Sequence, residues 1–306
     1  MASASISIED RTGWAAAGEV QRRFMQSAAP ADATFDFGAR CRQLDELGGD
    51  FYDCFPLDGG RFAMAVGDAS GKGLAAALMT SNVQSSVRTA AFYNGKLAET
   101  VETVNRHVHA TSLANRYATL FYAVLDGSSM RYVNAGHNPP IIVRGDGSVE
   151  RLEAGGPPVG MFAEWRYEEG AVRLYPGDVV VVYTDGVTEV ESARGEFWCL
   201  ESLAKAAIEK RARTASEWVD AVFQSMDEFA PGCQSDDATV TVLRITRPPL
   251  PLKSPQPRCF GADPEAGRAG VRGIPGCCMK STPGPARLPK PRALAGDRLR
   301  RWAQRA

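Results

Sequence analysis

The pattern of apolar and polar positions divides the chain into blocks of helices and blocks of strands. Near the N-terminus, Trp14, Val20 and Phe24 share one face of a helix predicted over residues 14–28. Two pairs of helical stretches follow later, at 73–92 with 97–113 and at 200–212 with 215–229. Runs rich in β-branched and aromatic residues predict strands at 34–43, 50–57, 61–68, 117–125, 130–135, 140–144, 149–152, 167–174, 178–184 and 237–246.

The order of these elements indicates the fold class. Strands come first, then a pair of helices, more strands, a second pair of helices and a final strand. This order differs from the strict alternation of strand and helix that builds a parallel sheet. A turn with hairpin chemistry, Asp58-Gly59-Gly60, joins two of the strands. We therefore predict an α+β fold in which antiparallel sheets are covered by layers of helices.

The composition changes after Thr246. Residues 248–306 hold 11 Pro and 7 Gly among 59 and show no apolar period, which is typical of a disordered segment. They carry 12 Lys/Arg and 3 Asp/Glu, a net charge of +9, whereas residues 1–247 carry a net charge of −10. We predict a linker or regulatory helix within 1–30, a globular domain at 31–247 and a basic tail.

These charges and the cysteine count exclude several classes of protein. An acidic globular part is a poor ligand for nucleic acid, because phosphate backbones attract basic surfaces. The seven cysteines are odd in number and scattered, so we expect reduced thiols rather than disulfides or a zinc site. No secretory signal is visible, and the apolar run at 179–183 is too short to cross a bilayer. We expect a cytoplasmic protein without a transmembrane segment.

Four acidic positions lie where apolar strand residues meet a glycine-rich or polar turn. Their sequences are Gly-Gly-Asp at 48–50, Gly-Asp-Ala-Ser-Gly-Lys-Gly at 67–73, Thr-Asp-Gly at 184–186 and Ser-Asp-Asp-Ala at 235–238. Hard cations such as Mg²⁺ and Mn²⁺ prefer oxygen ligands of this kind. Clustered carboxylates repel one another, so a bound cation is the natural reason to gather them. Each sequence taken singly is a common turn, and the joint pattern carries the prediction.

Other catalytic motifs are absent or open to two interpretations. The glycines at 67–73 fail the phosphate-loop pattern, because only three residues separate Gly67 from Gly71-Lys72. They still allow the Ala69 carbonyl to approach a metal. His137 is either a catalytic base or a residue that fixes a turn between two strands. No Gly-x-Ser-x-Gly elbow and no Cys-His nucleophile stand out.

Seven motifs in this order resemble the SpoIIE/RsbU-type branch of the PPM family, the protein phosphatase 2C-like serine/threonine phosphatases. The resemblance covers about residues 18–246. The motifs are Gly-Gly-Asp-Phe-Tyr-Asp at 48–53, Gly-Asp-x-Ser-Gly-Lys-Gly at 67–73, Tyr-Ala-Thr-Leu-Phe-Tyr at 117–122, Asn-Ala-Gly-His-Asn-Pro-Pro at 134–140, Gly-Gly-Pro-Pro-Val-Gly at 155–160, Tyr-Thr-Asp-Gly-Val-Thr-Glu at 183–189 and Asp-Asp-Ala-Thr at 236–239. The resemblance implies a four-layer αββα sandwich, two antiparallel sheets flanked by helices, for the domain at 31–247.

The same resemblance implies a site for two Mn²⁺ or Mg²⁺ ions. Asp68 is expected to bridge both ions, Asp185 and Asp236 to complete one metal site, and Asp50 and the Ala69 carbonyl to complete the other. The catalytic set is thus Asp68, Asp185 and Asp236. Three more residues are expected to support the ligands or to contact the substrate: Asp53, Lys72 and Asp237.

The implied reaction is hydrolysis of a phosphomonoester by a water activated between the two ions, without a covalent enzyme intermediate. In the eukaryotic branch, a His shortly after the bridging Asp is a candidate general acid. Here residues 69–71 are Ala-Ser-Gly, so the resemblance leaves the acid unassigned.

The implied substrate is phosphoserine or phosphothreonine on a STAS-domain anti-anti-sigma factor, in partner-switching regulation. The helix that contains Glu19-Val20-Gln21-Arg22-Arg23 resembles the segment that links a sensor to the phosphatase, so we expect a regulator or a homodimer to act through it. Two alternatives remain open: a catalytically silent module that binds a phosphoprotein, and a metal-dependent hydrolase of a small phosphorylated metabolite.

Overall fold

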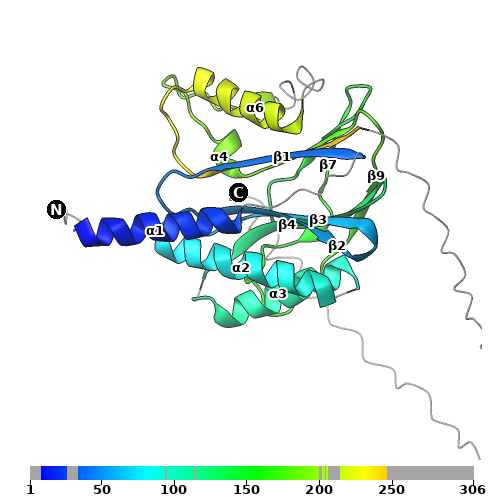
Figure 1. Cartoon of the computed structure of the whole chain (residues 1–306), viewed down its shortest axis with the longest axis horizontal. Coiled ribbons are helices and arrows are strands. Elements are labelled where there is room, and N and C mark those ends of the chain that lie inside the picture. The colour runs from blue at the N-terminus through cyan, green and yellow to red at the C-terminus, as the bar shows by residue number, and fades with distance from the viewer. Residues whose placement is uncertain are drawn as a thin grey trace, which may run out of the picture. The chain divides into compact units, whose positions relative to one another are not determined.

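Two β-sheets lie face to face at the centre of the chain's computed structural model, which describes residues 8–25, 34–93, 95–113, 115–199, 202–203, 205 and 214–246 (Figure 1). All of these residues belong to one structural unit, Met1–Leu252. The tail predicted at 248–306 and most of the helix predicted at 200–212 lie outside the described residues.

The first sheet contains five strands, and every pair in it is antiparallel. Its order is β1 (Phe35–Arg42), β11 (Ala238–Ile245), β10 (Val179–Tyr183), β6 (Ile141–Val143) and β7 (Val149–Arg151). The second sheet follows the order β2 (Asp50–Leu57), β3 (Arg61–Ala69), β4 (Ala118–Asp126), β5 (Ser129–Ala135) and β8 (Gly155–Gly156), and β9 (Gly170–Arg173) also pairs with β5. The predicted hairpin between β2 and β3 is closed by the short helix η1 (Asp58–Gly60).

One pair of strands differs from the predicted antiparallel sheets. Strand β8 has only two residues and runs parallel to β5, with Asn134 opposite Gly155. A side chain at Gly155 would lie within 1.8 Å of the Asn134 carbonyl oxygen, so glycine is required for this approach. Such a short strand has no period-2 pattern, and sequence analysis missed it for that reason.

Helices cover the outer face of each sheet (Figure 1). Helix α6 (Ala215–Phe229) packs on the first sheet, and α2 (Leu74–Tyr93) with α3 (Leu97–Thr111) packs on the second. Thr214 begins α6 with a capping box, because its side chain and that of Glu217 each accept a backbone N–H of the other residue. The layers run α, β, β, α, which confirms the predicted sandwich.

The buried apolar residues form three layers, one between the two sheets and one between each sheet and its helices. Side-chain alternation explains how one strand, β3, contributes to two of these layers. Phe62, Met64 and Val66 point into the core between the two sheets, whereas Ala63 and Ala65 point toward α2 and α3. The small alanines leave room for the helices to approach the strand closely. On the other side of the sandwich, the α6 residues that pack against the first sheet are Trp218, Val219, Val222, Phe223 and Met226.

The N-terminal helix α1 (Ile8–Phe24) begins earlier and ends earlier than the stretch predicted at 14–28. It lies alongside α2 (Figure 1), and Gln84 of α2 donates a hydrogen bond to the Phe24 carbonyl at 2.8 Å. Among the described residues, no helix is long and apolar enough to span a bilayer.

Candidate metal centre

Polar residues gather at one end of the layer between the two sheets. Asp50 and Asp68 are directly opposite each other on β2 and β3, and Thr119 of β4 is opposite Asp68. From the other sheet, Thr184 follows β10 and Thr239 lies in β11. All five positions continue the strand alternation that points apolar side chains into the central core, so the same pattern delivers polar side chains at this end.

The Asp50 carboxylate connects the two sheets. Its Oδ2 atom accepts hydrogen bonds from the hydroxyls of Thr184 and Thr239, both at 2.7 Å. The residue is only 2% exposed. Burial raises the pKa of Asp50 well above its ordinary value, and the nearby charge of Asp68 raises it further. A positive charge beside this carboxylate would therefore relieve a large electrostatic cost.

Asp68 interacts electrostatically with four other carboxylates, and the five residues are called the acidic group: Asp50, Asp68, Asp185, Asp236 and Asp237. Burial raises the pKa of the Asp68 carboxyl to about 8, and the charges of Asp185, Asp236 and Asp237 act in the same direction. Burial and the charge of Asp236 also raise the pKa of Asp185. Mutual repulsion of this kind means that the acidic positions identified along the sequence do converge in space.

A glycine allows the Asp185 turn to reach the loop before β11. Asp185 begins the short helix α4 (Asp185–Thr188), which sequence analysis did not predict. A Cβ atom on Gly186 would lie 1.9 Å from the Asp237 carbonyl oxygen, so a larger residue would push the two segments apart. The Asp-Gly pair is therefore a requirement of close packing as well as a turn signal.

Lys72 pairs with one of the predicted ligands. Its Nζ atom lies 2.9 Å from Oδ2 of Asp236 and donates to the Ser235 carbonyl at 3.0 Å. The ammonium group thus supplies positive charge to the edge of the acidic group. Its charge also partly offsets the pKa increases of Asp68 and Asp185.

Asp237 and Asp53 were also expected to support the ligands or to contact the substrate, and both hold parts of the fold together. Asp237 accepts hydrogen bonds from the backbone N–H groups of Leu44, at 2.8 Å, and Gly49, at 2.7 Å, and so holds the loop that leads into Asp50. Asp53 points to the opposite face of β2 and forms a two-point ion pair with Arg88 of α2. Its carboxylate therefore anchors α2 to the sheet and does not join the acidic group.

The donor set fits hard divalent cations. A Cβ atom on Gly49 would lie 3.0 Å from the Ala69 carbonyl oxygen and 3.1 Å from Oδ1 of Asp68, so both oxygens border the space that this glycine leaves open. Oxygen-only donors favour Mg²⁺ or Mn²⁺ over zinc. Across the described ranges, no three acidic, His or Cys side chains are already arranged around one point. Asp50 faces its two threonines and Asp236 faces Lys72, so these two side chains would have to turn toward an ion.

His137 contacts Thr119, which in turn bonds to the backbone of Asp68. Its Nδ1 atom is 2.9 Å from the hydroxyl of Thr119, and that hydroxyl accepts the Asp68 N–H at 3.2 Å. Burial lowers the pKa of His137 to about 4, while the nearby Tyr183 backbone partly offsets this effect. The backbone N–H of His137 donates a hydrogen bond to Oδ1 of Asn134 at 2.8 Å. Of the two interpretations of His137, the structure favours the turn-fixing one, because the imidazole is buried and neutral.

Arg116 is a site residue that sequence analysis missed. Its Nη1 atom donates to the Ser70 carbonyl at 2.6 Å, two residues beyond Asp68. Two further hydrogen bonds join the same segments, from Ser70 N to the Tyr117 carbonyl at 2.9 Å and from Tyr117 N to Ser70 Oγ at 3.0 Å. The only available signal was its position directly before the Tyr-Ala-Thr motif.

Comparison with known proteins finds relatives of this chain. A family model described as Stage II sporulation protein E (SpoIIE) matches residues 58–246. Phosphoserine phosphatase RsbU of Bacillus subtilis is 29% identical over 231 residues, which cover 74% of this chain and 68% of that protein. Protein IcfG of Synechocystis is 28% identical over 259 residues, again 74% of this chain but 40% of that protein.

A solved structure supports the fold independently. The SiaA-PP2C domain of Pseudomonas aeruginosa superposes with a TM-score of 0.68 and 18% identity, over 79% of this chain and 100% of that one. At this level of identity, the likeness establishes the fold alone. The chain spans well under half of the length of IcfG and about two thirds of the length of RsbU.

Proposed function

Because the chain belongs to the SpoIIE family, we propose that it is a metal-dependent protein serine/threonine phosphatase. The observation that carries this proposal is the group formed by Asp68, Asp185 and Asp236 in a fold shared with a PP2C domain, where burial and the charges of Asp185 and Asp236 raise the pKa of Asp68. A structural role alone does not account for such a group, because its repulsion destabilises the folded chain.

Each acidic residue has a specific task in this proposal. Asp68 would hold both of two Mn²⁺ or Mg²⁺ ions, Asp185 and Asp236 would complete one metal site, and Asp50 with the Ala69 carbonyl would complete the other. When bound, such cations activate water as a nucleophile and neutralise phosphoryl oxygens. Asp237 fixes the loop before Asp50 through the N–H groups described above. Lys72 balances the charge of Asp236.

The proposed substrate is a phosphoprotein. The relative RsbU is named a phosphoserine phosphatase, and this supports phosphoserine or phosphothreonine as the group hydrolysed. We extend the proposal to a STAS-domain anti-anti-sigma factor in partner switching, on the strength of the family resemblance. His137 is not assigned as the general acid, because it is buried behind Thr119 and its pKa is about 4.

Regulation is proposed to arrive through α1. Val20 and Phe24 of this helix are about half exposed, and they offer an apolar surface to a separate regulator or to a second copy of the chain. Toward the domain, Gln21 of the same helix is buried and bonds to the backbone of Gly48, two residues before Asp50. A partner that moves α1 would thereby move the Gly48–Asp50 segment.

Phosphate release from a phosphoserine STAS protein, measured with and without Mn²⁺, tests the function. We expect Mn²⁺-dependent release by the wild type and a loss of at least about a thousandfold in Asp68→Ala and Asp185→Ala, since removal of a metal ligand removes the activated water. Activity that survives both substitutions would refute the metal assignment. A metal-binding chain without turnover would favour the silent binding module, and turnover of small phosphate esters but no phosphoprotein would favour the metabolite hydrolase.

A further inference from the structure

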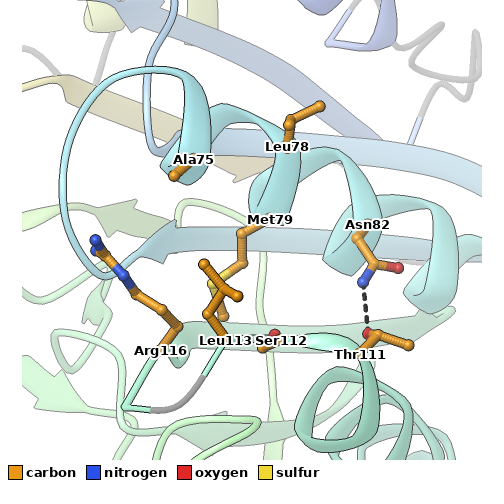
Figure 2. A pocket seen from close by; sticks show the side chains of 8 residues that line it. All are labelled: Ala75, Leu78, Met79, Asn82, Thr111, Ser112, Leu113 and Arg116. Atoms are coloured by element: carbon orange, nitrogen blue, oxygen red, sulfur yellow. Dashed lines mark hydrogen bonds between the residues drawn. The ribbon is translucent and has the colours of Figure 1, made fainter.

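A cavity of about 320 Å³ lies between α2 and the residues that follow α3 (Figure 2). Met79 of α2 and Leu113 of the joining segment point toward each other across it, as Figure 2 shows. Arg116 closes the end nearest the loop that leads into α2. The cavity wall is therefore mainly apolar with a single cation at one end.

A second cavity of about 570 Å³ begins on the other side of the same residues. The two cavities share Ser112, Leu113 and Arg116, and the second extends to Gly160 and Met161. Leu113 is 74% exposed although it belongs to both walls. The two cavities thus lie on either side of Arg116, and together they are called the groove below.

The groove meets the metal loop at Arg116. A Cβ atom on Gly71 would lie 1.7 Å from Nη1 of Arg116, so the guanidinium rests directly on the backbone of this loop. Gly71 also has a φ of +97°, which favours glycine independently. The hydrogen bond to the Ser70 carbonyl fixes the guanidinium two residues from Asp68.

The charge of Arg116 is not neutralised by a carboxylate in the part of the chain that the structure describes. Its one side-chain hydrogen bond is to a carbonyl oxygen, which leaves most of its five N–H donors available. Lys72, by contrast, already forms an ion pair with Asp236. An unpaired guanidinium beside a metal loop is suited to a phosphoryl group, which it can bind through two parallel hydrogen bonds.

We propose that Arg116 binds the phosphoryl group of the substrate phosphoserine and that the groove on either side of it holds the residues that flank this phosphoserine. The inference rests on the proposed phosphatase function. The occupant is an extended phosphoprotein segment with an aliphatic residue next to the phosphoserine, because Leu113, Met79 and Leu78 line the side toward α2. The charge of the phosphoryl group complements the one cation in the wall.

The decisive variants are Arg116→Lys and Arg116→Gln. Glutamine retains a hydrogen-bond donor for the Ser70 carbonyl but removes the charge, whereas lysine retains both. Arg61→Ala is the matched control, because Arg61 also donates to a backbone carbonyl but lies at the opposite end of β3 from Asp68. Each is assayed in Mn²⁺ with para-nitrophenyl phosphate and with a phosphoserine peptide that has leucine beside the phosphoserine.

In Arg116→Gln, we expect KM for both substrates and the inhibition constant of inorganic phosphate to rise by about tenfold to a hundredfold, as for loss of a charge-assisted hydrogen bond. Arg116→Lys should lie in between, and Arg61→Ala should match the wild type. The Mn²⁺ concentration for half-maximal activity should stay constant. If instead phosphate inhibition is unchanged in Arg116→Gln while the Mn²⁺ requirement shifts, Arg116 only braces the loop and the inference is wrong.

The groove is tested by Leu113→Asp, with Val149→Asp on the exposed edge strand β7 as its control. We expect KM for the leucine-containing phosphopeptide to rise at least about tenfold in Leu113→Asp, because an aspartate in the wall repels the phosphopeptide and removes apolar contact. Its KM for para-nitrophenyl phosphate should rise by less than the KM for the peptide, because this substrate has no leucine that loses contact with the wall. Equal peptide kinetics in both variants would exclude the groove.

Calorimetric titration of inorganic phosphate into the Mn²⁺-loaded protein needs no turnover and separates the two proposals. A wild type that binds phosphate through Arg116 but hydrolyses no phosphoester would contradict the proposed function and sustain the role of Arg116. A wild type that hydrolyses phosphopeptides but binds phosphate equally well with Arg116→Gln would sustain the function and refute the role of Arg116.

Discussion

Gln21 of α1 forms hydrogen bonds with both backbone polar groups of Gly48. Its Nε2 atom donates to the Gly48 carbonyl at 2.8 Å, and its Oε1 atom accepts the Gly48 N–H at 3.1 Å. The next residue, Gly49, donates its N–H to Asp237 and accepts the hydroxyl of Thr80. The side chain of one residue in the N-terminal helix thus fixes the backbone on which the acidic group is built.

The substitution Gln21→Ala should weaken metal binding and stability together. It leaves a buried N–H and a buried carbonyl of Gly48 without partners, which costs about 1–3 kcal/mol of unfolding free energy. The freed loop should also raise the apparent Kd for Mn²⁺ by about tenfold. Chemical denaturation and Mn²⁺ titration measure both effects. The exposed neighbour Arg22→Ala is the control, and equal Mn²⁺ affinity in the two variants would show that α1 is not coupled to the site.

Gly186→Ala should uncouple Asp185 from the loop before β11. The new methyl group would overlap the Asp237 carbonyl, which a Cβ atom would approach to 1.9 Å, so the Asp236-Asp237 segment must move. We expect Mn²⁺ affinity to fall by about tenfold to a hundredfold, as when the support of a metal ligand is lost. Gly95→Ala is the matched control, because nothing lies within 4 Å of a Cβ atom there. Unchanged Mn²⁺ affinity in Gly186→Ala would contradict the assigned contact.

The metal-free protein should lose stability as the pH rises. The pKa of Asp68 is about 8 in the folded state, against an ordinary value of 3.8, so the folded state binds more protons than the unfolded state between these pH values. Stability from this group is therefore highest near pH 4 and declines up to about pH 8, with a slope of up to about 1.4 kcal/mol per pH unit. Asp50, Asp185 and Asp237 act in the same direction.

Thermal unfolding of the metal-free protein between pH 5.5 and 8 measures this dependence. In Asp68→Asn the decline should be shallower, and saturating Mn²⁺ should suppress it in the wild type, because a bound cation displaces the proton. The exposed residue Asp126 provides a control, since Asp126→Asn should retain the wild-type slope. A wild-type melting temperature that rises steadily across this range would contradict the proposed electrostatic repulsion.

Arg88→Ala should lower stability while metal binding is kept. It removes the ion pair of Asp53, whose carboxylate is 1% exposed, and the stacking of Arg88 over the Phe55 ring at 4.6 Å. We expect a loss of about 1–3 kcal/mol, against less than about 1 kcal/mol for Lys96→Ala in the exposed pair with Glu99. The apparent Kd for Mn²⁺ should stay within about twofold. A large change in that Kd would place Asp53 in the metal site after all.

Strand alternation in the sequence is enough to distinguish the roles of Asp50 and Asp53. Asp50 and Asp53 are three positions apart in one strand, so their side chains must face opposite sides of the sheet. The structure assigns Asp50 to the layer between the sheets and Asp53 to the helix layer. The motif resemblance placed both residues at the site, whereas the two-residue period of the strand already predicted that they face opposite sides of the sheet.

The sequence by itself determined the local elements and the identity of the acidic turns. The strands at 50–57 and 61–68, their hairpin and the acidic turns at Asp68 and Asp185 were all predictable, because period-2 patterns and turn residues act over short distances. The motif order also predicted the four-layer sandwich.

Only the tertiary structure decided how distant segments meet. Gln21 bonds to Gly48 across 27 positions, and Arg116 reaches Ser70 across 46. These contacts depend on how α1 and the α3–β4 connection pack on the second sheet, which no local pattern specifies. The acidic turns were therefore visible along the chain, but the residues that position them, and the groove beside them, became visible only when the layers were assembled.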